Sequence, residues 1–211
     1  MKYIAHEDKQ GPDGISVQEG PVPIYDKDNE VLIKVEACAA NRADLLQSRG
    51  QYPPPPGVTK VIGLECAGYV VDPKTNVITD RRVMALLSGG GYAQFAKVHK
   101  DHVIDIPEEL SFETAACIPE KFLTSYQILH KIADIQEDET VLILAGASGI
   151  GTSMIQLCNY AGASSIAISS SDAKLEQCKK IGAYACVNYK QYPSFSDRVQ
   201  LFTDGEGVDV V

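Results

Sequence analysis

The sequence predicts an irregular antiparallel β domain followed by a doubly wound parallel α/β sheet. Residues 1–115 carry recurrent turn signals and a strand-period alternation of apolar residues at 31–37. Residues 116–211 alternate apolar strands with helical spacing. The second sheet is expected to be incomplete, a fragment of a longer parent, because this fold normally has about six strands and the chain stops within a fourth.

In the first domain, turn clusters recur from Gly-Pro-Asp-Gly at 11–14 to the glycines at 89–91. Helical spacing at 112–117 and 123–132 leads into the second domain without a low-complexity linker. The two domains are therefore expected to share a cleft.

The second domain contains VLILAGASGIG at 141–151, in which an all-apolar strand at 141–144 meets a glycine cluster. Helical spacing from Ile150 to Ala161 follows. A strand, a glycine turn and a helix N-terminus form a site where backbone N–H groups hold a phosphate. The alternative is that these glycines only permit a tight turn and close packing. The predicted cofactor-binding residues are Gly146, Ser148, Gly149, Ile150 and Gly151.

The later elements continue the alternation of strands and helices. Ser171 or Asp172 is expected to cap the second helix, and Gly182 to follow its end. The expected strands are 165–169, 185–188 and the beginning of one at 208–211; the expected helices are 172–181 and 195–202.

Composition excludes several classes of function. The net charge of −9 argues against a nucleic-acid-binding surface. No apolar run approaches the roughly 20 residues that a membrane helix needs, and MKYIAHEDKQ lacks the apolar core of a secretory signal. The six cysteines form no C-x-x-C pair, which favours reduced thiols in a cytoplasmic protein.

Several stretches together resemble one family, the zinc-independent quinone oxidoreductases of the medium-chain dehydrogenase/reductase superfamily, and most closely the branch induced by the p53 tumour suppressor. The resemblance implies a GroES-like β-barrel catalytic domain, an incomplete Rossmann-type NADPH-binding domain, and a homodimeric parent of which this chain is about two thirds. The stretches that carry it are NRADLLQSRGQYPPPPG (41–57), VIGLECAGYV (61–70), MALLSGGGYAQF (84–95), IPEKFLTSYQIL (118–129), AGASGIGTSMIQL (145–157) and KLEQCKKIGA (174–183).

No metal is expected. Zinc-dependent relatives carry cysteine and histidine where this chain has Asn41 and Leu64, and a catalytic zinc needs about three protein ligands. His99 and His102 have no acidic or cysteine partner at ligand spacing and are interpreted as surface residues.

The expected cofactor is NADPH. An NAD site usually has an acid at the end of the second strand, whereas this chain has serines at 169–171. Ser171 and Lys174 suit a 2′-phosphate. In the family that this chain resembles, the residues matching Lys174 and Tyr189 bind that phosphate. Asp172 is interpreted as a helix cap. The alternative for Lys174 is a solvated lysine of the first helical turn.

Without a metal, the acceptor must be oriented and its developing oxyanion stabilised by hydrogen-bond donors. Asn41 and Tyr52 are the candidates, and by resemblance they line the substrate cleft, with Thr124 near the nicotinamide and Asp44 orienting the loop. The alternatives are a packing role for Tyr52 and a helix N-cap role for Asn41, which is compatible with catalysis.

The sequence therefore predicts an NADPH-dependent reductase of a small-molecule quinone or enone. A second hypothesis is a reductase of 2-enoyl thioesters from the same superfamily. A third is a truncated, catalytically inactive nucleotide-binding protein.

Overall fold

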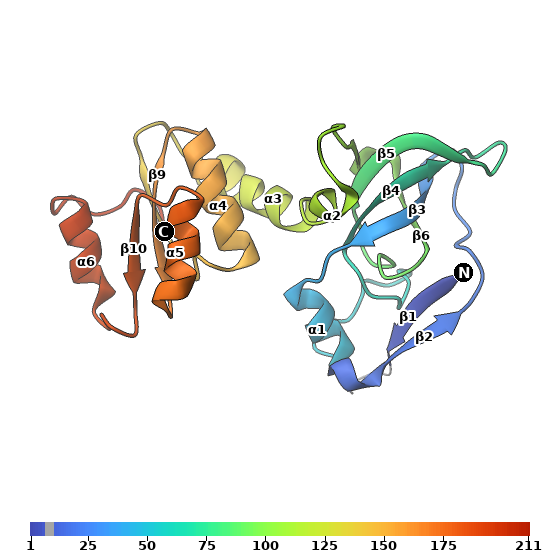
Figure 1. Ribbon diagram of the computed structural model, residues 1–211, viewed down its shortest axis with the longest axis horizontal. Coiled ribbons are helices and arrows are strands. Elements are labelled where there is room, and N and C mark those ends of the chain that lie inside the picture. Colours follow the sequence, from blue (N-terminus) through green and yellow to red (C-terminus); the bar gives the residue numbers. More distant parts are fainter. Residues whose placement is uncertain (7–10) are drawn as a thin grey trace. The chain divides into compact units, whose positions relative to one another are not determined.

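The computed structural model describes residues 1–6 and 11–211. The chain divides into two compact units, Met1–Glu120 and Lys121–Val211 (Figure 1). Each unit has its own hydrophobic core, so each is described by itself.

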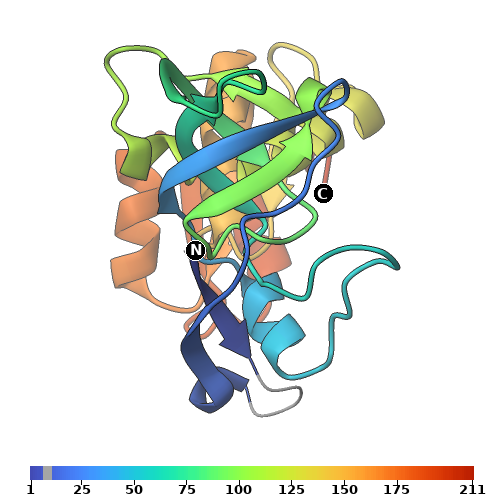
Figure 2. The ribbon, with the colours of Figure 1, turned by 90° about the vertical axis from the view of Figure 1, so that its right-hand side faces the viewer.

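The N-terminal unit is built on an antiparallel sheet in the order β6-β3-β4-β5-β7. Figure 2 shows β3 in blue beside β6 in green, with the β1–β2 pair apart from them. The antiparallel β domain predicted from the turn signals is confirmed. Its strands are β1 (Lys2–His6), β2 (Ile15–Glu19), β3 (Glu30–Cys38), β4 (Glu65–Val71), β5 (Ile78–Leu86), β6 (Phe95–His99) and β7 (Val103–Asp105).

Short helices complete this unit. Three residues separate the end of β3 from the helix α1 (Arg42–Ser48), and α2 (Phe112–Ala115) is capped by the Ser111 hydroxyl. Single 3-10 turns span Gly11–Gly14 and Lys100–His102. One face of the sheet buries the cluster around Ile33, Cys66 and Val83. A second cluster, around Ala67 and Met84, packs against α2.

The second unit contains a parallel sheet in the order β10-β9-β8, made of β8 (Thr140–Ile143), β9 (Ser164–Ser169) and β10 (Ala185–Asn188). On the free side of β8, Val141 forms a parallel bridge with Val210. The order in which strands are added to the sheet reverses at β8, with β9 and β10 on one side and the Val210 bridge on the other. Doubly wound sheets bind ligands at such a topological switch point.

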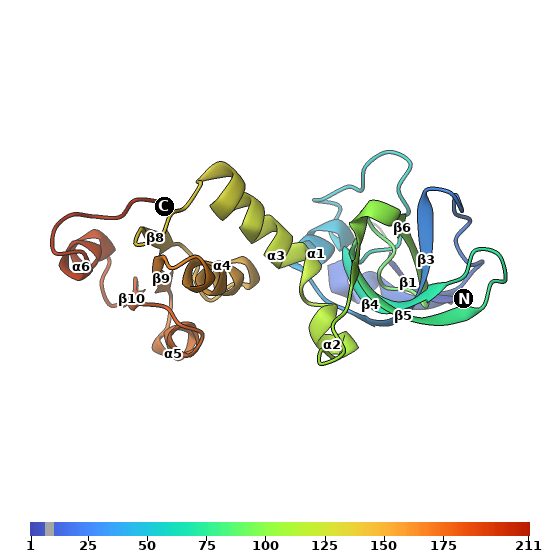
Figure 3. The ribbon, with the colours of Figure 1, turned by 90° about the horizontal axis from the view of Figure 1, so that it is seen from above.

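Helices cover both faces of this sheet, as Figure 3 shows from above. The helices α4 (Gly149–Tyr160) and α5 (Asp172–Lys180) pack one face through Ile155 and Cys178. The helix α6 (Phe195–Phe202) packs the other face through Val199. These elements confirm the predicted alternation of strands and helices.

Two predicted elements differ. The helix expected at 123–132 is an α-helix, α3 (Pro119–Tyr126), that continues as a π-helix, η3 (Gln127–Ile132). Apolar spacing over so few residues does not separate the two helix types. The strand expected at 208–211 is reduced to the single bridge at Val210. The Asp209 carboxylate accepts the Thr140 N–H at 2.7 Å, where a regular ladder would use a backbone carbonyl.

Candidate functional site

The glycine turn after β8 is shaped by close packing at two of its glycines. A Cβ at Gly146 would lie 2.8 Å from the Cβ of Ala167, and a Cβ at Gly151 would lie 2.5 Å from the carbonyl oxygen of Gly146. The turn also holds Ala145 in the left-handed region, with φ of 52°. The packing interpretation therefore accounts for Gly146 and Gly151.

Close packing does not explain the third glycine of the turn, Gly149. A Cβ there would meet only the Lys121 side chain, at an ordinary 3.7 Å, and its φ lies outside the left-handed region. Gly149 is also exposed and opens the helix α4, and glycine is a poorer helix former than alanine. Neither packing nor backbone geometry requires a glycine at this position.

The first turn of α4 presents backbone donors. Ser148 is the N-cap, and its hydroxyl accepts the Gly151 N–H at 3.0 Å. The N–H groups of Gly149 and Ile150 have no partner within the helix by geometry, and the helix dipole adds positive potential there. With 12 residues in the helix, this end can hold an anionic group.

A buried serine pair fastens α3 to this turn. The hydroxyls of Ser125 and Ser153 are 2.7 Å apart, and that of Ser153 also donates to the carbonyl of Gly149 at 3.1 Å. Both serines are fully buried. Thr124, which precedes Ser125, is thereby held on a helix attached to the glycine turn. The sequence does not reveal this pair, because small hydroxyls in apolar helices resemble packing residues.

The predicted 2′-phosphate residues gather where β9 and β10 end. Tyr189 follows β10, and its N–H donates to the Ser169 carbonyl at 3.1 Å. Ser171 stands at the N-cap of α5 and Lys174 lies exposed in the first turn of that helix. Because parallel strands end on the same edge, these residues share the sheet edge with the glycine turn.

The interpretation of Asp172 as a helix cap is wrong. Asp172 is the first residue of α5, and its two carboxylate oxygens accept hydrogen bonds from other side chains. The Asn188 amide donates at 2.8 Å and the Gln191 amide at 2.7 Å. The hydrogen bonds from Asn188 and then Gln191 lower the pKa of Asp172, so that carboxylate is ionised at neutral pH.

In the N-terminal unit, Asp44 is the centre of a buried polar cluster. It is 3% exposed. One carboxylate oxygen accepts the Asn41 N–H at 2.7 Å and the Tyr92 hydroxyl at 2.9 Å. The other accepts the Gly63 N–H at 3.2 Å. Asp44 thus ties the start of α1 to two loops of the sheet.

Glu65 extends this cluster. It is 1% exposed, and its carboxylate accepts the side-chain amide of Asn41 at 2.8 Å and the Glu120 N–H at 2.9 Å. Asn41 is both the N-cap of α1 by position and a side-chain donor. Sequence reasoning missed Glu65 and Tyr92. A carboxylate inside the apolar run VIGLECAGYV was the available signal, since a buried charge needs partners.

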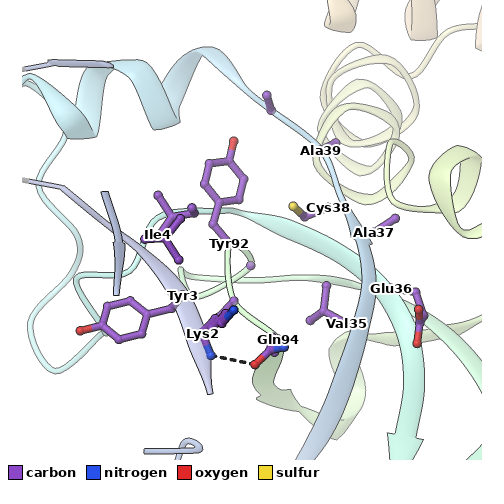
Figure 4. A pocket seen from close by; sticks show the side chains of 14 residues that line it. Lys2, Tyr3, Ile4, Val35, Glu36, Ala37, Cys38, Ala39, Tyr92 and Gln94 are labelled. Atoms are coloured by element: carbon purple, nitrogen blue, oxygen red, sulfur yellow. Dashed lines mark hydrogen bonds between the residues drawn. The ribbon is translucent and has the colours of Figure 1, made fainter. Parts of the chain in front are cut away.

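An open pocket of about 600 Å³ lies beside the cluster, and its walls are mostly apolar. Tyr92 and Cys38 extend into the same space in Figure 4. Burial, followed by the Asp44 hydrogen bond, raises the pKa of Tyr92, so its phenol stays protonated and donates. Burial also raises the pKa of Cys38.

Tyr52 lies outside the Asp44 cluster. It is 48% exposed in the loop after α1, and among the described residues no hydrogen bond or ring contact joins it to the Asp44 cluster. Its catalytic role and that of Asn41 stay predictions.

The residues around Asn41 do not suit a zinc ion. The Asn41 amide donates to Glu65, and Leu64 offers no ligand atom. Among residues 1–6 and 11–211, no three His, Cys, Asp or Glu side chains gather as a metal site. Nor does any helix in that part of the chain have the length and apolarity to cross a membrane.

Comparison with known proteins matches both units. The alcohol dehydrogenase GroES-like domain matches residues 27–108, and the zinc-binding dehydrogenase family matches residues 149–211. A zinc-type alcohol dehydrogenase-like protein of Schizosaccharomyces pombe is 30% identical over 98% of this chain and 67% of its own length. A highly-reducing polyketide synthase of Aureobasidium melanogenum is 36% identical over 92% of this chain, which spans only 9% of that protein.

Solved structures also match nearly the whole length of this chain. The Escherichia coli quinone oxidoreductase, complexed with NADPH, superimposes with a TM-score of 0.85 and 28% identity over 99% of this chain and 64% of its own. The CurK enoyl reductase has a TM-score of 0.84 and 29% identity over 99% of this chain and 66% of its own.

Proposed function

The chain belongs to the medium-chain dehydrogenase/reductase superfamily, and we propose that it reduces quinones or activated enones with NADPH and without a metal ion. The observation that carries the proposal is Gly149, a helix-opening glycine for which the fold gives no steric reason. A backbone that must approach a pyrophosphate closely gives that reason. The placement in the p53-inducible branch, a homodimeric parent and a cytoplasmic location remain predictions from the resemblance.

The NADPH would be held by two groups of residues on one edge of the second unit. The first turn of α4 would bind the pyrophosphate, and Ser171, Lys174 and Tyr189 would bind the 2′-phosphate. NADPH-bound relatives such as the Escherichia coli enzyme support this assignment. When bound, the cofactor supplies the hydride. Thr124, held by the serine pair, is proposed to contact the nicotinamide.

Asn41 and Tyr52 are proposed to donate hydrogen bonds to the acceptor oxygen as negative charge develops there. The Asn41 side chain is held by Glu65 and its backbone by Asp44, which fixes the donor before substrate arrives. The apolar pocket beside Tyr92 suits a flat organic acceptor. Metal independence is supported by Asn41 and Leu64, which replace the two zinc ligands.

The proposed function is tested by oxidation of NADPH with a series of quinones, before and after chelator treatment. We expect turnover with NADPH that survives chelation. Turnover that requires stoichiometric zinc would contradict the proposal, and NADPH binding without any turnover would favour the inactive nucleotide-binding protein.

An enoyl reductase is the second candidate, and the similarity to the CurK enoyl reductase favours it. Both functions would use NADPH, and both would use Asn41 and Tyr52 as hydrogen-bond donors to the acceptor oxygen. A direct competition between a quinone and a 2-enoyl thioester at equal concentration separates them.

Lys174→Ala is expected to weaken NADPH binding about tenfold or more, because a hydrogen bond to a charged group contributes about 1.5–3 kcal/mol. NADH binding should be nearly unchanged, since the exposed Lys174 would contact only the 2′-phosphate. The measurement is calorimetric titration with both cofactors. An equal loss for both would show that Lys174 does not bind the 2′-phosphate.

Tyr52→Phe is expected to lower quinone turnover while leaving the melting temperature nearly unchanged, because only an exposed hydroxyl is removed. Steady-state kinetics with several quinones and a thermal melt measure the two effects. Unaltered kinetics would assign Tyr52 to packing.

A further inference from the structure

Asp172 is the acidic side chain next to the predicted 2′-phosphate site. It directly follows Ser171, just beyond the end of β9. A carboxylate at the end of this strand, the second of the nucleotide-binding fold, normally favours NAD over NADP. Both oxygens of its carboxylate are engaged, one by the Asn188 amide at 2.8 Å and the other by the Gln191 amide at 2.7 Å. Asp172 is therefore held toward the turn at 188–192, which follows β10.

Asn188 is a rigid donor. It is 7% exposed at the end of β10. Its side-chain oxygen accepts the Lys190 N–H at 3.1 Å, and its backbone carbonyl accepts the N–H groups of Gln191 and Tyr192 at 3.1 and 2.9 Å. These bonds close the 188–192 turn on itself. The two amides that hold Asp172 therefore come from the same turn.

That turn also carries Tyr189, whose N–H donates to the Ser169 carbonyl. The bonds to Asp172 thus join the start of α5, which bears Lys174, to the loop that bears Tyr189. A single carboxylate connects the two predicted phosphate-binding segments.

We propose that Asn188 and Gln191 engage both oxygens of the Asp172 carboxylate so that it does not repel a 2′-phosphate, and that this arrangement determines the preference of this chain for NADPH over NADH. The inference rests on the proposed function. Two donors partly neutralise the carboxylate charge and fix its direction. Released, the same carboxylate could rotate toward Ser171 and repel the phosphate. Asn188 and Gln191 are positioning residues in this account.

The test uses two probes that differ by the 2′-phosphate, 2′,5′-ADP and 5′-AMP, titrated calorimetrically into this chain. Gln191→Ala removes one donor from an exposed residue. We expect it to weaken 2′,5′-ADP binding about three- to tenfold and to leave 5′-AMP binding within about twofold. Gln177→Ala, at an exposed glutamine of α5, is the matched control and should change neither.

The decisive comparison is Gln191→Ala in an Asp172→Asn background. Asparagine has no charge to repel the phosphate, so Gln191→Ala should then leave 2′,5′-ADP binding unchanged. The same loss in both backgrounds, or an equal loss for both probes, would overturn the inference while leaving NADPH use intact. A wild-type chain that binds both probes equally would overturn the NADPH assignment itself. Thermal melts of every variant separate these outcomes from misfolding.

Discussion

Asp44→Ala is expected to destabilise the N-terminal unit by several kcal/mol, because each buried donor left without an acceptor costs about 1–3 kcal/mol. The substitution leaves the N–H groups of Asn41 and Gly63 and the Tyr92 hydroxyl without their acceptor in a site that is 3% exposed. Because α1 and two sheet loops meet at this carboxylate, quinone turnover should also fall. Urea denaturation followed by circular dichroism measures the stability change.

Tyr92→Phe is the control, because it removes one of the three donors and keeps the ring. Its cost should be about 1 kcal/mol. If Asp44→Ala cost no more than Tyr92→Phe, Asp44 would not organise the cluster.

Gly151→Ala is expected to destabilise the second unit by about 2–3 kcal/mol through overpacking. The added Cβ would lie 2.5 Å from the carbonyl oxygen of Gly146 and 2.6 Å from its Cα. These are backbone atoms, so the turn and the start of α4 must move apart, and NADPH binding should be lost with them. Thermal melting and cofactor titration measure the two effects.

A variant that melted like the wild type would show that the turn relaxes freely. Gly162→Ala is a less suitable comparison, because its φ of 76° adds backbone strain. Gly149→Ala is the matched control for stability. Its Cβ meets open space apart from an ordinary contact with Lys121, and alanine is the better helix former by up to about 1 kcal/mol.

The second unit was the more predictable from its sequence. Buried parallel strands are apolar on both faces, so Val141–Ile143 and Ile166–Ile168 were recognisable without their partners. Helix periodicity placed α4, α5 and α6. The π-helix was missed because it needs the same apolar residues as an α-helix. The role of Asp172 was missed because its partners lie 16 and 19 residues away.

The polar cluster of the N-terminal unit was predictable only in part. The signature segment drew attention to Asn41 and Asp44, which lie three residues apart. Glu65 and Tyr92 join them from 24 and 48 residues away along the chain. Such contacts depend on how β4 and the loop before β6 reach α1, which no local pattern in the sequence specifies.

The most direct test of the central claim, that the glycine turn binds the pyrophosphate of NADPH, is a titration of NADPH into the wild type and Gly149→Ala. The fold does not require this glycine, so a stability effect cannot imitate a binding effect. We expect Gly149→Ala to melt at or above the wild-type temperature and to bind NADPH at least about tenfold more weakly, which corresponds to about 1.4 kcal/mol. Equal NADPH affinity in the two proteins would contradict it.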